Sequence, residues 1–148
     1  GFPITKEKLM AKYMLIMRNS GTQQDFEDMD FEAVINAMGA YNESMMKAGV
    51  LVGGDGLTDA AQGTVVEFTG EAPLVTDGPY GEVHELFNGF WIVEVATQAE
   101  AVEWAKRAPL GAGNKIEVRR MTDETDFADF ADNEFVQKEK EWRGEQQS

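Results

Sequence analysis

Residues 89–95, GFWIVEV, decide the fold, because they form the clearest strand of the chain. The stretch is short, apolar and rich in aromatic and β-branched residues, which is typical of a strand. Side chains alternate across a strand, so two faces result: Phe90, Ile92 and Glu94 on one, and Trp91, Val93 and Val95 on the other. Glu94 is therefore a carboxylate on an otherwise apolar face, where it needs a partner or water.

A helix and a further strand follow this stretch. Thr97 and Glu100 have the spacing of a capping box, in which the threonine caps one amide and the glutamate reaches back. Pro109 ends the helix because it has no N–H and cannot continue one. Lys115–Arg120, KIEVRR, then predicts the last strand of the domain.

Upstream, the pattern also begins with a strand and a helix. Residues 12–18, KYMLIMR, predict a buried strand. Apolar residues at three- and four-residue steps from Phe31 to Met45 predict an amphipathic helix. Asp30 is its expected N-cap and Gly49 its expected stop.

The middle of the chain contains a second strand and a hairpin. Residues 50–52 begin the strand, and the glycines at 53, 54 and 56 end it or bulge it. The glycine run lacks the lysine of a phosphate-binding loop, so we interpret it as a bulged turn and expect no cofactor there. Residues 64–68 and 74–76 predict the two arms of a hairpin, followed by a turn at 77–80.

The order of these elements predicts an α+β fold. Strand, helix, strand, inserted β-hairpin, strand, helix and strand correspond to a ferredoxin-like βαββαβ sandwich with an insertion. Helices on one face of a sheet leave the other face to be covered, so we expect a homodimer.

Composition restricts the possible functions. The chain has 148 residues, which suits one domain, and a formal net charge of -14, which disfavours nucleic acid and anionic membrane surfaces as partners. It contains no cysteine and one histidine, His84, which excludes disulfides, thiolate metal sites and any site with two imidazoles from one chain. No early apolar run is long enough for a signal or membrane segment, so a cytoplasmic protein is expected.

Three segments are expected along the chain. Residues 1–10 are interpreted as a tag remnant or disordered N-terminus, 11–121 as the folded domain and 122–148 as an acidic C-terminal extension. The extension contains nine acids and three bases with interspersed aromatic residues. It is either a short helix laid over the domain or a dimer mate, or a lid or partner-docking tail.

The stretch at 74–95, LVTDGPYGEVHELFNGFWIVEV, resembles the signature of the YCII-related family, in the subgroup named for its DGPF motif. Tyr80 occupies the fourth motif position, and the resemblance extends over roughly residues 12–120. It implies a protomer of the dimeric α+β barrel type with a small-molecule pocket near the dimer interface and acid/base residues in the cleft. Many members of the subgroup have a lysine where this chain has His84.

Asp77 and His84 are the candidate catalytic residues. Gly78 and Pro79 make a rigid turn, on which the Asp77 carboxylate can act as a base or bind a hydroxyl; alternatively it only caps the turn. His84 titrates near neutrality and lies between Glu82 and Glu85, which favour its charged form. It is either a general acid/base or a surface histidine.

Tyr41, Tyr80 and Glu94 are the candidate substrate-binding residues. Glu94 is either a pocket carboxylate or the partner of Arg119 in a structural ion pair. Tyr41 belongs to the apolar stripe of the first helix, so it is either a core residue or directs its hydroxyl into a cleft. No residue spacing indicates a metal site.

Three classes of function remain open. The first is a small enzyme that performs acid/base chemistry on a small organic molecule, with cyclic or aromatic compounds among the candidates. The second is a non-enzymatic small-molecule-binding or regulatory dimer, and the third is a structural interaction domain. A pocket on which acid and base converge would indicate the enzyme, and an apolar pocket without them would indicate the binding module.

Overall fold

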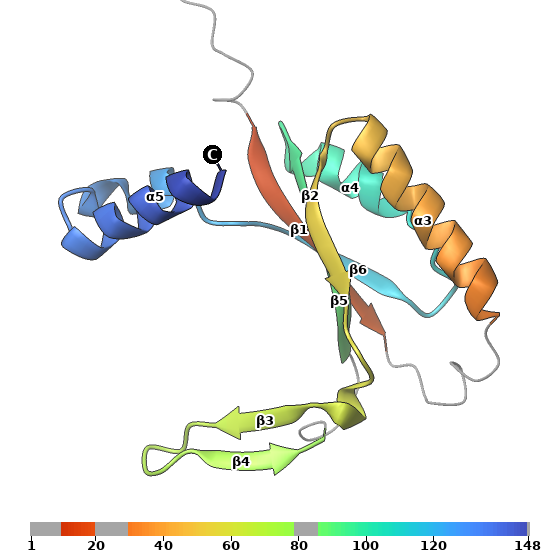
Figure 1. Ribbon diagram of the computed structural model, residues 1–148, viewed down its shortest axis with the longest axis horizontal. Coiled ribbons are helices and arrows are strands. Elements are labelled where there is room, and N and C mark those ends of the chain that lie inside the picture. Colours follow the sequence, from red (N-terminus) through yellow and green to blue (C-terminus); the bar gives the residue numbers. More distant parts are fainter. Residues whose placement is uncertain (1–9, 20–29, 79–85, 148) are drawn as a thin grey trace, which may run out of the picture.

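The computed structural model describes residues 10–19, 30–78 and 86–147 and has an α+β architecture (Figure 1). The main unit consists of one sheet and two helices. Its elements are, in chain order, β1 Ala11–Asn19, α3 Phe31–Lys47, β2 Leu51–Gly56, β5 Leu86–Val95, α4 Gln98–Lys106 and β6 Lys115–Arg120. The strands form one four-stranded sheet in the order β2-β5-β1-β6, and every pair is antiparallel. Helices α3 and α4 lie on the same face of this sheet (Figure 1).

Three of the helix ends form at the residues that the sequence indicates, whereas α4 ends at Lys106, before the expected stop at Pro109. The Asp30 side chain accepts a hydrogen bond from the backbone N–H of Ala33 at 3.2 Å and caps α3. After the last turn, Gly49 takes a φ of 73°, which glycine adopts at little cost. At α4 the Thr97 hydroxyl accepts from the Glu100 N–H, and the Glu100 carboxylate accepts from the Ala96 N–H. The predicted capping and the predicted stop of α3 are therefore confirmed.

The core lies between the sheet and the two helices. Its largest fully buried side chains come from β1, α3 and β5: Leu15, Met45, Val93 and Val95. The alternation predicted for the central strand is confirmed, because Trp91, Val93 and Val95 are buried while Phe90, Ile92 and Glu94 are only half-buried. We call the side of the sheet that carries this second set the open face, because α3 and α4 cover the other side (Figure 1).

The glycine run differs from the prediction. It is not a turn, because β2 continues through it to Gly56 and pairs with β5 along the way. A register shift between Leu51 and Gly53 provides the bulge. The strand persists because bare backbone fits closely here: a Cβ added to Gly54 would lie 2.6 Å from the Phe90 carbonyl oxygen.

The inserted hairpin and the C-terminal extension lie outside the sheet and its two covering helices. The inserted hairpin, β3 Thr64–Glu67 and β4 Leu74–Asp77, is preceded by the short 3-10 helix η1 Ala60–Gln62 and stands apart from the main sheet (Figure 1). The C-terminal extension forms the 3-10 helix η2 Glu124–Phe130 and the helix α5 Glu134–Gln147, which lies away from α3 and α4 (Figure 1). No helix in the described part of the chain is long and apolar enough to span a bilayer.

Candidate functional site

Asp77 ends strand β4 in the protruding hairpin. Its carboxylate is exposed and accepts a long hydrogen bond, 3.4 Å, from the hydroxyl of Thr64, its partner across the hairpin. The following Gly78 has a φ of 86° and donates its N–H to the Gly63 carbonyl at 2.8 Å, so the chain direction at this bend is fixed. Within the described residues, the Asp77 side chain is thus held at the base of the hairpin by its contact with Thr64. The turn residues whose amides it would cap, 79–85, lie outside the described residues.

Tyr41 lies in the core beneath the helices. It is 6% exposed, and its hydroxyl donates to the Trp104 carbonyl oxygen at 2.7 Å. Burial raises the pKa of Tyr41 to about 12, while nearby Arg107 acts in the opposite direction. The tyrosine is therefore a neutral donor that connects α3 with α4. Of the two expected roles, its position is that of a core residue.

Glu94 has a different neighbour from the one expected. On the sheet it lies opposite Lys12 of β1. Arg119 is on β6, with β1 between it and β5, and its carboxylate partner is Glu117. The predicted Glu94–Arg119 ion pair is therefore wrong, because the strand order separates the two side chains by one strand.

The candidate residues do not converge in the described part of the chain. His84 and Tyr80 lie outside the described residues. Asp77 belongs to the hairpin, Tyr41 to the core and Glu94 to the open face of the sheet, so these three occupy separate places (Figure 1). None of the three lines either of the two cavities described below.

A cavity of about 360 Å³ lies between α3 and the β2 edge of the sheet, a volume suited to a small ligand. We call it the glycine cavity. Its lining comes from β1, α3, β2 and β5: Met17, Met38, Asn42, Leu51, Gly53, Gly54, Asp55, Gly56, Phe90 and Trp91.

The glycines hollow out this cavity from the core side. Gly54 is paired with Trp91, and Gly56 with Gly89, and directly paired residues point to the same face of a sheet. Because Trp91 faces the helices, Gly54 and its neighbour two positions on face them as well. At positions 54 and 56 the edge strand thus places no side chain toward the helix layer, and the vacant volume forms part of the cavity.

One amide is oriented at the wall of the glycine cavity. The indole N–H of Trp91 donates to the Asn42 Oδ1 atom at 2.8 Å, which fixes which end of the amide is the acceptor. The Nδ2 group of Asn42 carries no hydrogen bond to the described residues, so it remains a donor. The Trp91 ring is held in turn by an edge-on contact with Tyr41, with 5.2 Å between ring centroids and 84° between planes.

A second cavity, of about 510 Å³, lies between α4 and β6. Its described lining contains aliphatic side chains, two lysines and two amide side chains, but no aromatic ring and no carboxylate. The glycine cavity combines an aromatic wall with an oriented polar group, which is the usual construction of a specific small-molecule site.

Metal binding has no counterpart in the described residues. They contain no group of three or more histidine, cysteine, aspartate or glutamate side chains placed to hold an ion.

The sequence analysis did not predict the glycine cavity, although one signal for it was present. Glycines at alternate positions 54 and 56 share a face of any strand that runs through them.

The comparison with known families agrees with this fold. The YCII-related domain family matches residues 11–125. The chain belongs to the YCII-related domain family. The match begins at the first residue of β1 and ends within η2, so it includes the glycine cavity and the hairpin. No curated protein matches the chain.

Proposed function

We propose that this YCII-related protein binds a small organic molecule in the glycine cavity. The observation that carries the proposal is the absence of side chains at the helix-facing positions of β2, next to Trp91 and the oriented Asn42 amide. Glycine costs strand stability, and an edge strand gains nothing from an empty space beneath a helix. Close backbone approach accounts for Gly54, whereas a ligand that occupies the space accounts for Gly56, where an added Cβ would meet no atom within 4 Å.

The lining indicates the chemistry of the ligand. Trp91 favours a flat, mainly apolar molecule, and the thioethers of Met17 and Met38 adapt to its outline. The Asn42 Nδ2 group requires an acceptor such as a carbonyl oxygen or ring nitrogen. No lysine or arginine among the described residues lines this cavity, so an anionic ligand would lack a counter-charge.

Binding is favoured over catalysis on geometric grounds. An acid/base enzyme requires titratable groups within hydrogen-bond reach of a bound molecule. Asp77, the described member of the expected catalytic pair, is exposed on the hairpin and lines neither of these two cavities. Asp55 contributes to the lining of the glycine cavity, but it is paired with Phe90, so its carboxylate points to the open face of the sheet. The binding module thus fits the described residues better than the acid/base enzyme.

The same proposal includes a ferredoxin-like protomer of the DGPF subgroup that pairs with a second copy. The strand order β2-β5-β1-β6 supports the ferredoxin-like arrangement, since β1 and β5 are the central strands and each is followed by a helix. The Asp77-Gly78-Pro79-Tyr80 sequence supports the subgroup. Apolar side chains on the open face, such as Ile92 and Phe90, support a homodimer in which the second copy covers that face.

Thermal denaturation against a panel of neutral, planar heterocycles tests the binding proposal. A ligand present at about 100 times its Kd stabilises the protein by about 2.7 kcal/mol, which raises the melting temperature by several degrees. Gly56→Leu should abolish these shifts, because a Cβ at this position meets no atom within 4 Å and the longer side chain fills the cavity.

The matched control is Gly111→Leu, which adds the same side chain beside the α4–β6 cavity, also with no atom within 4 Å of the new Cβ. This variant should keep the shifts. Loss of the shifts in Gly111→Leu but not in Gly56→Leu would move the site to the other cavity. Shifts unaffected by either substitution would remove the site from both.

A further inference from the structure

Helix α3 is buried in its second half and exposed in its first half. In the second half, Tyr41 is 6% exposed and Met45 is fully buried. In the first half, Phe31 is 60% exposed and Ile35 66%. The first half of α3 thus leaves two large apolar side chains mostly uncovered by the described chain.

These two side chains lie on the side of α3 that lines the glycine cavity. Phe31 precedes Met38 by seven residues, Ile35 precedes Asn42 by the same spacing, and both of the later residues line the cavity. Seven residues make about two turns of a helix, or about 10 Å along its axis, so each pair shares one side. The cavity wall therefore continues toward the N-terminus of α3 as an exposed apolar strip of two side chains, Phe31 and Ile35, which we call the α3 strip.

The sheet carries few side chains at this end of the cavity. Gly56 is paired with Gly89, and Gly89 in turn with Met17. Because Trp91 faces the helices, Gly89 two positions before it also faces them, together with both of its partners. A Cβ added to Gly89 would lie 2.5 Å from the Met17 Cε atom, so the flexible side chain of Met17 lies over this glycine. This end of the cavity is thus bounded by bare backbone and one adaptable side chain.

Helix α3 and strand β2 separate toward the same end. Residues 48–50 connect Lys47 at the end of α3 to Leu51 at the start of β2, so the two elements are close there. The N-terminal part of α3 leads away from β2 (Figure 1). The β2 lining follows this trend, because Leu51 is half-buried whereas Gly56 is exposed. The glycine cavity therefore opens toward the α3 strip.

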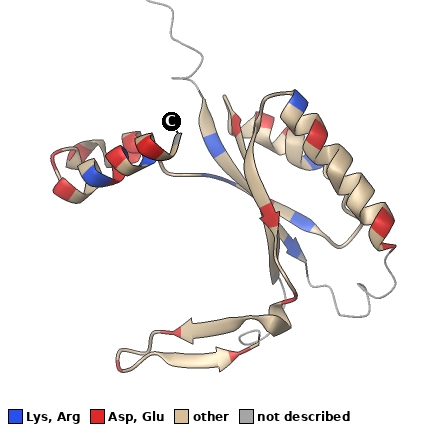
Figure 2. Ribbon diagram, in the orientation of Figure 1, with Lys and Arg blue, Asp and Glu red and all other residues tan. Residues whose placement is uncertain are grey.

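The elements around this opening provide no positive charge. Residues 31–46 and 48–105, which include nearly all of α3 and the whole of β2 and β5, contain no lysine or arginine. The middle of α3, residues 33–42, has no charged residue at all (Figure 2). An anionic group at the opening would lack a counter-charge from these elements, whereas a hydrocarbon chain requires none.

We propose that the ligand of the glycine cavity has an unbranched alkyl tail, with its planar head at Trp91 and Asn42 and its tail passing over Gly56 to the α3 strip. The inference rests on the binding function proposed above and narrows the ligand class to heterocycles with an apolar tail. A planar head alone leaves Phe31 and Ile35 in water, whereas a tail buries part of both side chains together with its own methylene groups.

The size of the α3 strip favours a tail over a second protein chain. A stable protein–protein contact buries about 1,200–2,000 Å² in total. Two side chains in line provide far less, but they match the width of one alkyl chain, and they continue the wall of a cavity that already suits a small molecule.

Isothermal titration calorimetry of the full chain with two probes tests the proposal. The probes are carbostyril, a neutral bicyclic lactam, and its derivative with a butyl group on the benzo ring. Each buried methylene group raises affinity by up to about fourfold, so the butyl derivative should bind at least tenfold more tightly than carbostyril. In Phe31→Ser with Ile35→Ser, this ratio should fall below threefold while the Kd of carbostyril stays unchanged.

Two control variants locate the effect. Met46→Ser removes an apolar side chain that is 64% exposed from the last turn of the same helix, and it should keep the affinity ratio of the wild type. Gly56→Leu fills the cavity and should abolish the binding of both probes. Circular dichroism of each variant checks that the fold is retained.

The outcomes separate this inference from the binding function on which it rests. Equal affinities of the two probes for the wild type, or a ratio that survives Phe31→Ser with Ile35→Ser, would overturn the tail and leave the binding function standing. Weaker binding of both probes to that variant would place the head itself on the α3 strip, which also overturns the tail. If neither probe binds the wild type, this inference fails, and the thermal denaturation panel above decides the binding function separately.

Discussion

The Tyr41 hydroxyl and the Trp104 backbone carbonyl lie 2.7 Å apart, in a hydrogen bond that joins α3 to α4. The same tyrosine ring packs edge-on against Trp91 of the central strand. One side chain thus connects both helices with the sheet, and the wall of the glycine cavity depends on it through Trp91. The N–H of Arg107 also donates to the Trp104 carbonyl, at 3.1 Å, so this oxygen keeps a partner if the hydroxyl is removed.

Tyr41→Phe should therefore lower the free energy of unfolding at neutral pH by only about 1 kcal/mol, the usual net value of one hydrogen bond. Folding raises the pKa of Tyr41 from 10.0 to about 12, so its contribution to stability is complete below pH 10 and is lost as the pH rises through 12. Urea denaturation at pH 8 and at several values above 10 measures this. A pKa shift of this size is worth more free energy than one hydrogen bond, so the wild-type curve should fall below the variant curve as the pH rises through 12. A constant difference between the curves would contradict the assignment.

Gly54→Ala should lower the free energy of unfolding by about 2 kcal/mol, as expected for overpacking. The new Cβ would lie 2.6 Å from the Phe90 carbonyl oxygen and 3.0 Å from the Trp91 Cα atom, and neither backbone atom can move freely. Gly56→Ala is the matched control, since nothing lies within 4 Å of its Cβ, and it should be nearly neutral. Equal effects of the two substitutions in urea denaturation would show that β2 does not approach β5 as closely as described.

The contrast between these glycines explains why β2 was only partly predicted. Single-sequence patterns assign strands to apolar and β-branched residues, and those end at Val52. The strand continues because Gly54 allows the edge backbone to approach Trp91, and that requirement arises only when the two strands are paired. By contrast, β5 and β6 carry their own apolar alternation, so local pattern was sufficient for them.

The candidate site was harder to predict than the fold, because it depends on register and packing. The position of Glu94 on an apolar face predicted a partner or water, but only the strand order shows that Lys12 lies opposite and that Arg119 is one strand further away. Likewise, the Tyr41 pattern left two roles open until the crossing of α3 and α4 placed a carbonyl beside its hydroxyl. Alternation along a strand is a local property, whereas the contacts of a side chain are not.

Asn42→Ala should lower the free energy of unfolding by about 1–2 kcal/mol, because the indole N–H of Trp91 loses its acceptor in a half-buried position. It should also abolish the thermal shifts of ligands that bind in the glycine cavity. Asn36→Ala, at an exposed position on the same helix, is the matched control for removing an amide from α3. Retained shifts in Asn42→Ala would show that the amide does not contact the ligand.

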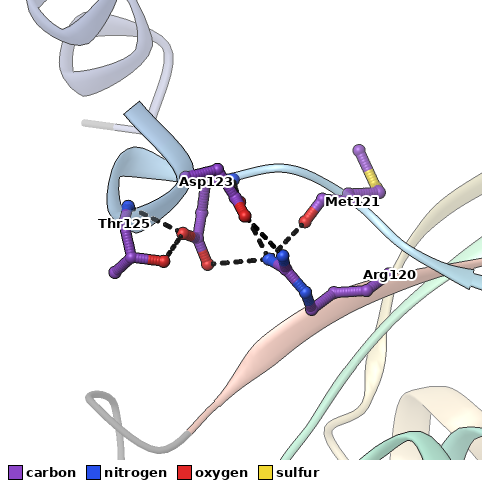
Figure 3. Close-up of polar contacts among 5 residues, drawn as sticks. Arg120, Met121, Asp123 and Thr125 are labelled. Atoms are coloured by element: carbon purple, nitrogen blue, oxygen red, sulfur yellow. Dashed lines mark hydrogen bonds and ion pairs between the residues drawn. The ribbon is translucent and has the colours of Figure 1, made fainter. Parts of the chain in front are cut away.

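The Arg120–Asp126 pair makes the attachment of the C-terminal extension sensitive to acid; the polar contacts of Arg120 are shown in Figure 3. The hydrogen bonds from Arg120 lower the pKa of Asp126 from 3.8 to about 2, with the Asp123 backbone N–H as a further cause. Because the folded state depresses this pKa, the contribution of the pair is complete above pH 3.8 and is lost as the pH falls through about 2. Hydrogen exchange in η2, compared between pH 5 and pH 2, should report its release.

Asp126→Asn should bring this release to neutral pH, since an amide cannot form the charged bidentate contact with Arg120. We expect faster hydrogen exchange in η2 at pH 7 with unchanged protection in β1 and β5. Asp129→Asn removes a carboxylate from the same 3-10 helix that makes no ion pair within the described residues, and it should leave exchange at wild-type rates. If both variants exchange alike, general charge reduction rather than the Arg120 contact governs the attachment.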